Sequence, residues 1–133
     1  MGRSELREKC MVILYQLDIY KKNNIDVDVD TSIKENIEID NDYVKDIVYG
    51  VVTHLNDIDK LANDNMKAWS IERIDKTGAS ILRIAIYELK YTDTPEIVII
   101  NEAVELAKKY SDDNVCKIIN AVLDKMIKEW FCG

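Results

Sequence analysis

Two glutamates in the C-terminal half of the sequence have the spacing of a catalytic carboxylate pair. Glu102 and Glu105 lie in the stretch VIINEAVELAKKY (98–110), and residues three apart share one face of a helix. Such a pair could transfer protons or help to bind a metal ion. The surrounding charges favour a structural role, because acidic residues early in a helix and Lys108 and Lys109 at its end complement the helix dipole. Glu105 and Lys109 also have the favourable i,i+4 order, so we predict a helix without catalytic function.

The other candidate catalytic and metal-binding motifs are incomplete. His54 is the only histidine and has no obvious nucleophile to activate, so we predict a partly exposed structural residue. The stretch DVDVD (26–30) begins like a calcium loop, but Thr31 and Ile37 stand where that loop needs Gly and Glu. The three cysteines form no CxxC motif, which argues against a zinc site. We therefore expect a binding module that is not an enzyme and that uses no metal or cofactor.

Length and composition are those of one globular domain. The chain has 133 residues, of which 47% are hydrophobic and 32% charged, and a chain of this size can bury a substantial core. No apolar run approaches the roughly 20 residues that span a bilayer, and the N-terminus lacks the apolar core of a secretory signal. We expect a cytoplasmic protein that does not associate with membranes.

The net charge of −7 is distributed unevenly along the chain. Residues 1–22 contain five basic and three acidic residues, whereas residues 26–46 contain two basic and eight acidic residues. An acidic protein is a poor general binder of nucleic acid. A small basic site at the N-terminal end remains compatible with this distribution.

Apolar residues recur at helical spacing in most of the chain, and nothing suggests a set of strands. The pattern predicts helices over about 4–22, 42–61, 76–90 and 98–110, and another from 112 to about 130. We expect Ser4, Asp75 and Ser111 to be N-caps, and Gly50 to mark the close approach of another backbone. Residues 23–40 are predicted to be a loop with at most one helical turn near 32–37. The fold class is therefore all-α, a compact bundle.

Several motifs in the C-terminal half resemble those of the NusB family of bacterial transcription antitermination factors. These are ILR at 81–83, YEL at 87–89, INEA at 100–103, ELAK at 105–108 and KIINAVLD at 117–124. The N-terminal stretch RSELREKCMVILYQLD is similar to the first helix of that family, which ends in a Leu-Tyr pair, here Leu14 and Tyr15.

The resemblance implies a single domain over residues 1–133 with about six to seven helices in two subdomains, roughly 1–68 and 69–133. It also implies a function. The chain would bind boxA-like single-stranded RNA together with the small-subunit ribosomal protein NusE. It would act on RNA polymerase indirectly, supporting ribosomal RNA transcription without catalysing a reaction.

Carried over by position, the resemblance implies two sets of site residues. The RNA-binding set is Arg3, Arg7, Tyr15, Lys117 and Ile118, and the partner-binding set is Tyr87 and Glu88. Arg and Lys bind phosphates, and bases stack on aromatic rings. Ile118 stands where the family has Phe, and the arginine patch is thin, so we expect weak RNA binding alone and stronger binding with NusE. We also expect the arginines, Tyr15 and Lys117 to share a groove.

Two alternatives stay open at this point. The chain could be the NusB-like RNA-binding module of an RNA methyltransferase. It could instead be a self-associating helical protein, such as a homodimer, that does not bind RNA.

Overall fold

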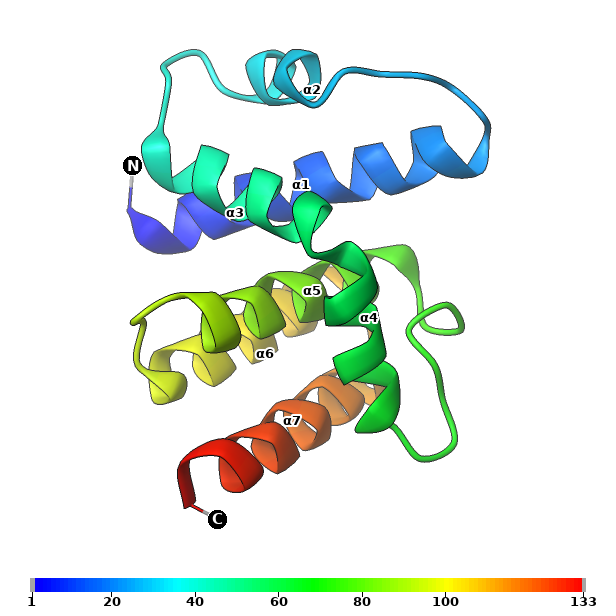
Figure 1. The fold of residues 1–133 in the computed structure, drawn as a ribbon, viewed down its shortest axis with the longest axis vertical. Helices are drawn as coiled ribbons and strands as arrows, with labels where there is room; N and C mark the ends of the chain where they lie inside the picture. Colours follow the sequence, from blue (N-terminus) through cyan, green and yellow to red (C-terminus); the bar gives the residue numbers. More distant parts are fainter. Residues whose placement is uncertain (1, 133) are drawn as a thin grey trace.

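A computed structural model describes the backbone of residues 2–132 and the side chains of residues 2–130. Within that range the chain forms seven α-helices, a terminal π-helical turn over Lys128–Cys132 and no strand. The helices are α1 (Arg3–Lys22), α2 (Val29–Asn36), α3 (Asp42–Thr53), α4 (Leu55–Asp64), α5 (Lys76–Tyr91), α6 (Glu96–Tyr110) and α7 (Asp113–Ile127) (Figure 1). The predicted all-α class is confirmed.

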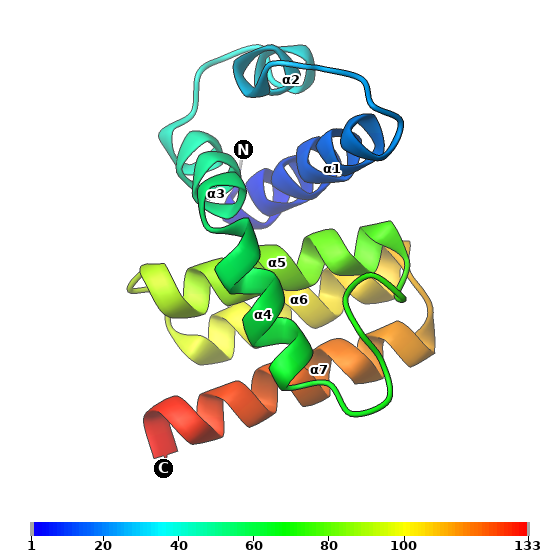
Figure 2. The ribbon, with the colours of Figure 1, turned by 45° about the vertical axis from the view of Figure 1, so that its right-hand side comes forward.

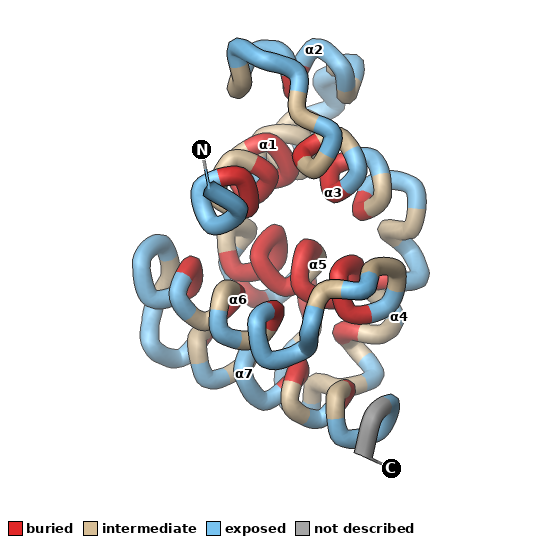
Figure 3. Tube along the Cα trace, turned by 90° about the vertical axis from the view of Figure 1, so that its left-hand side faces the viewer, coloured by how far each residue is buried: buried red, intermediate tan, exposed pale blue. Residues whose placement is uncertain are grey.

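Helix α5 lies at the centre of the molecule. Helices α1–α3 form one group and α4–α7 another, and α5 faces the first group (Figures 1 and 2). Eleven of the sixteen residues of α5 are buried, and its buried turns lie opposite those of α1 and α3 (Figure 3). A helix that is apolar on nearly every side must be covered on nearly every side. The predicted subdomain boundary near residue 68 stays a prediction.

Polar caps fix several helix starts. Asn41 and Asp75 are the N-caps of α3 and α5, and each side chain accepts a hydrogen bond from a backbone N–H three residues later. The Asp75 cap is therefore confirmed. Asp112 rather than Ser111 caps α7, because the Ser111 hydroxyl donates instead to Asp75 at 2.5 Å. The predicted cap at Ser4 is also wrong, since α1 already begins at Arg3.

The single helix predicted over 42–61 is two helices. The break falls at His54, which ends α3 and precedes α4 with φ −103° and ψ 20°. Helix α3 packs against both α1 and α5. Helix α4 packs mainly against α5. The apolar period runs through His54 without interruption, so periodicity does not reveal the change of direction. As predicted, His54 is partly exposed, and its ring stacks on Tyr91 at a centroid distance of 4.2 Å.

Gly50 permits a close contact, but with a different neighbour from the one expected. A Cβ atom at this position would collide with the far end of the Tyr87 ring, not with a backbone. The absence of a side chain therefore lets α3 lie on the aromatic ring of α5.

The segment expected to be mostly loop contains the two-turn helix α2. Helix α2 packs on α1 and α3, and Ile33 is buried against the core. Burial of one apolar side chain against neighbouring helices stabilises a segment whose own sequence is too short and polar to indicate a helix.

No helix between residues 2 and 132 has the length and apolar character that crossing a membrane requires.

Candidate nucleic-acid interface

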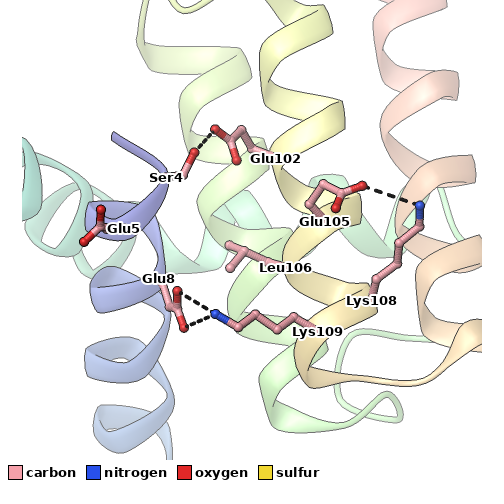
Figure 4. A pocket seen from close by; sticks show the side chains of 8 residues that line it. All are labelled: Ser4, Glu5, Glu8, Glu102, Glu105, Leu106, Lys108 and Lys109. Carbon is pink, nitrogen blue, oxygen red and sulfur yellow. Dashed lines mark hydrogen bonds and ion pairs between the residues drawn. The ribbon is translucent and has the colours of Figure 1, made fainter. Parts of the chain in front are cut away.

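A hollow of about 430 Å³ lies between α1 and α6 (Figure 4). Two polar bridges cross it. The Ser4 hydroxyl donates a hydrogen bond to Glu102, and the Lys109 ammonium donates to Glu8 at 3.1 and 3.3 Å. The carboxylates of this hollow therefore hold two helices together across a gap.

The carboxylate pair that raised the question of catalysis is part of this connection. Glu102 accepts hydrogen bonds from Ser4 and Arg7, and Glu105 pairs with Lys108 at 3.5 Å. The predicted Glu105–Lys109 pair is wrong, because Lys109 reaches across to α1 instead. The described residues contain no cluster of side chains suited to hold a metal ion. Glu102 therefore joins α6 to α1, and Glu105 pairs within its own helix.

Arg7 lies below this hollow, in the interior. Its exposed fraction is 3%, and its Nε and Nη2 atoms donate to the two oxygens of Glu88 at 2.8 and 2.9 Å. The Tyr43 hydroxyl donates to the same carboxylate at 3.1 Å. Burial by itself would lower the pKa of the Arg7 guanidinium, but the hydrogen bonds and charge of Glu88 raise it overall. Arg7 is thus a permanent cation that is committed to joining α1 to α5.

Arg3 lies one helical turn earlier and faces solvent. Its guanidinium stacks 4.0 Å above the centre of the Tyr43 ring and keeps its donors exposed. Of the two predicted RNA-binding arginines, only Arg3 can reach a phosphate without a rearrangement of the core.

Two half-exposed tyrosines line a separate hollow of about 320 Å³ beside α1. Tyr15 comes from the middle of α1 and Tyr110 ends α6, and their exposed fractions are 39% and 42%. The Lys109 ammonium lies 5.1 Å from the centre of the Tyr110 ring. The hollow itself offers two aromatic faces, on which the bases of a single-stranded nucleic acid can stack, and Lys109 lies beside it in an ion pair with Glu8.

The remaining RNA-binding candidates lie on α7. Lys117 is exposed, whereas Ile118 is half-buried and lines a further hollow with Trp69. The structure does not bring the arginines, Tyr15 and Lys117 into one of these hollows: Arg7 and Tyr15 line two different ones, and Lys117 lines neither. Arg3 and Tyr15 are also separated by about 18 Å along α1, from a helical rise of about 1.5 Å per residue.

The two partner-binding candidates are both buried. Tyr87 packs against Gly50, and its hydroxyl donates to Asp46 at 3.1 Å. Burial and this hydrogen bond raise the pKa of Tyr87 to about 12. Glu88 is 1% exposed and binds Arg7. Neither side chain offers an appreciable surface to another protein.

Comparisons with known proteins assign the chain to a family. The model of the NusB family matches residues 4–128. The chain belongs to the NusB family. The transcription antitermination protein NusB of Macrococcus caseolyticus is 39% identical over 130 residues, which cover 96% of this chain and 98% of that protein. The names of such NusB relatives are those of transcription factors, which agrees with the expectation that the chain is not an enzyme.

Solved NusB structures have the same fold. A structure of T. maritima NusB matches with a TM-score of 0.84 and 29% identity, covering 97% of this chain and 92% of that one. A crystal structure of the antitermination factors NusB and NusE in complex with dsRNA matches with a TM-score of 0.81 and 26% identity, covering 96% and 97% of the two chains. The expected NusB-like helical bundle is confirmed.

Tyr110 and Lys109 are the residues of this surface that sequence reasoning missed. The signal was present in KKY (108–110), where two cations precede an aromatic residue at a helix end. From the sequence alone, the position of these lysines at the end of a helix is explained by the helix dipole. Only the position of Tyr15 next to Tyr110 shows that the segment contributes to a surface.

Proposed function

We propose that this NusB-family chain binds boxA-like single-stranded RNA together with a NusE-type small-subunit ribosomal protein. In this role it acts in the cytoplasm, contacts RNA polymerase indirectly and supports ribosomal RNA transcription. Family membership supports the proposal, and the named complex of NusB and NusE with dsRNA supports its partner and its binding of RNA.

The observation that carries the proposal is the hollow lined by Tyr15 and Tyr110. The two rings are exposed enough to stack on unpaired bases, and Lys109 stands beside Tyr110. Stacking tolerates any base because every base has a π-face. Lys109 binds the phosphate between bases by exchanging its exposed ion pair with Glu8 for the RNA. Sequence-specific recognition of RNA relies mostly on such splayed single strands.

The predicted arginines have two different roles in this proposal. Arg3 and Lys117 are exposed and bind phosphates. Arg7 acts indirectly, because its bonds to Glu88 and Glu102 fix the position of α1 and therefore of Tyr15.

The partner raises RNA affinity in the proposed complex. The net charge of −7 opposes the approach of a polyanion, so the chain alone binds weakly. Tyr87 and Glu88 support the NusE-facing surface from below, since both are buried. In the proposed complex, the exposed residues that cover Tyr87 and Glu88 contact the NusE-type protein.

The test is a titration of end-labelled boxA-like RNA, followed by fluorescence anisotropy, with and without the NusE-type protein. Tyr15→Ala should weaken binding by roughly five- to one-hundred-fold, the range expected for loss of one stacked base. Tyr49→Ala is the matched control, because Tyr49 on α3 is 38% exposed compared with 39% for Tyr15.

Equal losses in the two variants would show that Tyr15 has no special role. Equal and salt-insensitive affinities with and without the partner would contradict the proposal itself, since phosphate contacts release counterions and weaken as salt rises.

A further inference from the structure

A second hollow, of about 350 Å³, lies between residues 65–69 and one face of α7. Its lining includes Met66, Lys67, Trp69, Ile118 and Lys125. The Trp69 indole is 45% exposed, the highest fraction among the aromatic side chains in the described part of the chain. The exposed ring lies beside the aliphatic side chains of Met66 and Ile118, which line the same hollow.

The segment that presents Trp69 is anchored at both sides. The Asn65 amide donates to the carbonyl of Leu61 at 2.8 Å, and the backbone N–H of Ile71 donates to Asn63 at 2.8 Å. Ile71 is itself buried in the core. The hollow is therefore held open by hydrogen bonds that do not involve Trp69.

The charges around the hollow are all of one sign. Lys67 and Lys125 line it, no carboxylate does, and neither ammonium has an ion-pair partner within residues 2–130. Asp64 and Asp124, the acidic residues nearest to Lys67 and Lys125 in the sequence, pair with Lys60 and Lys128 instead. In a chain of net charge −7, a hollow with only cations is complementary to an anion.

We propose that this hollow holds one unpaired base of single-stranded RNA, stacked on Trp69, with Lys67 and Lys125 binding the adjacent phosphates. The inference rests on the proposed function and extends its site. A protein occupant fits less well, because lysine is depleted from the centres of protein–protein interfaces. An aromatic face with flanking cations is the arrangement that binds single strands.

The hollow is continuous along the chain with the proposed RNA surface. Tyr110 ends α6, α7 begins at Asp113, and Lys117 and Ile118 lie just over one turn into α7. Lys117 is exposed between the two aromatic sites in sequence. In this proposal a strand that stacks on Tyr15 and Tyr110 passes the exposed Lys117 before it reaches Trp69.

The direct test uses Trp130→Phe, which leaves Trp69 as the sole tryptophan. A labelled single-stranded RNA of about 12 nucleotides, within the range of known single-strand sites, is titrated into this full-length variant at low salt. Anisotropy reports binding and Trp69 emission reports stacking. We expect the emission to be quenched along the same curve as the anisotropy.

Substitutions provide a second readout. Trp69→Ala should weaken binding by roughly five- to one-hundred-fold, and Trp69→Phe should recover most of it because a ring is kept. Trp130→Ala is the control, since Trp130 is also exposed, at 38%, but lies outside the hollow. Lys125→Ala should flatten the salt dependence of binding, whereas Lys60→Ala should leave it unchanged.

The outcomes separate this inference from the proposed function. RNA binding with unchanged Trp69 emission, and with unchanged affinity in Trp69→Ala, would overturn the inference alone. Absence of RNA binding even with the NusE-type protein would overturn both. A change in oligomeric mass on Trp69→Ala without a change in RNA affinity would show that a second copy covers the hollow, and would also overturn the inference.

Discussion

At the scale of single residues, Arg3 and Arg7 show how one helical turn changes what a side chain can do. They carry the same charge four positions apart on α1. Arg7 points into the interface with α5 and binds Glu88, whereas Arg3 lies over the outer face of Tyr43. Burial of a charge is costly unless it is paired. Arg7 consequently stabilises the packing of α1 on α5, whereas Arg3 remains available to bind a phosphate.

The first prediction follows from this difference. Arg7→Ala should lower the free energy of unfolding by about 3–5 kcal/mol, because Glu88 would remain buried without its partner. Arg3→Ala, the matched control, should cost at most about 1 kcal/mol, the size of an exposed cation–π contact. Urea denaturation of the two variants measures both values.

The double variant Arg7→Met with Glu88→Leu distinguishes a buried-charge penalty from a general loss of packing. It should recover most of the stability lost in Arg7→Ala, because replacing both ions by apolar groups is often close to neutral. A double variant as unstable as Arg7→Ala would contradict this account.

At the scale of helices, contacts with α5 decide how the other elements lie. Arg83 of α5 binds Asp59 of α4 through two hydrogen bonds of 2.8 and 3.0 Å, and pairs with Asp18 of α1 at 3.5 Å. One guanidinium thereby joins three helices. Together with the Gly50–Tyr87 contact, this explains why the chain turns at His54 rather than continuing as one long helix.

Gly50→Ala tests that arrangement. Alanine favours a helix by about 1 kcal/mol over glycine, yet the variant should be less stable, because the new methyl group collides with the Tyr87 ring. Overpacking of this kind typically costs about 1–3 kcal/mol. The ring cannot simply move aside, since it is buried and its hydroxyl binds Asp46.

The same substitution in a Tyr87→Leu background should have the opposite sign. Leucine lacks the ring atoms that the methyl group would meet, so the helix preference of alanine should dominate. Thermal unfolding of the four proteins measures the coupling. Additive effects of the two substitutions would argue against a direct contact.

At the scale of the whole molecule, charge distribution limits where RNA can approach. The segment 26–46, which includes α2, contains eight acidic residues, whereas the aromatic hollows are flanked by lysines. The acidic residues of this segment repel the phosphates of an approaching RNA strand over a long range, without direct contact. Affinity should therefore depend on charges that are not part of the site.

Neutralising Glu35 and Glu38, which are exposed near α2, tests this effect. The double variant Glu35→Gln, Glu38→Gln should bind RNA several-fold more tightly at low salt. The gain should vanish near 1 M salt, where the Debye length is only about 3 Å. A gain that persists at high salt would indicate a direct contact instead. Anisotropy titrations at the two salt concentrations provide the measurement.

The sequence by itself determined the helical class and several helix starts, because these depend on neighbours a few residues away. Asn41 and Asp75 cap the helices that follow them whatever lies beyond, and the apolar period of 76–90 predicts a buried helix. The motifs at 81–124 also indicated the family before any fold was known.

Only the tertiary structure decided which of the chemically similar residues stay available. Arg7 and Glu88 are 81 positions apart. Tyr15 and Tyr110 come from two helices and line one hollow, and the Lys109 side chain reaches from α6 to Glu8 on α1. Burial and pairing depend on how helices pack, and no local pattern contains that information. The interface is therefore composed of residues whose types were visible in the chain and whose roles were assigned by packing on α5.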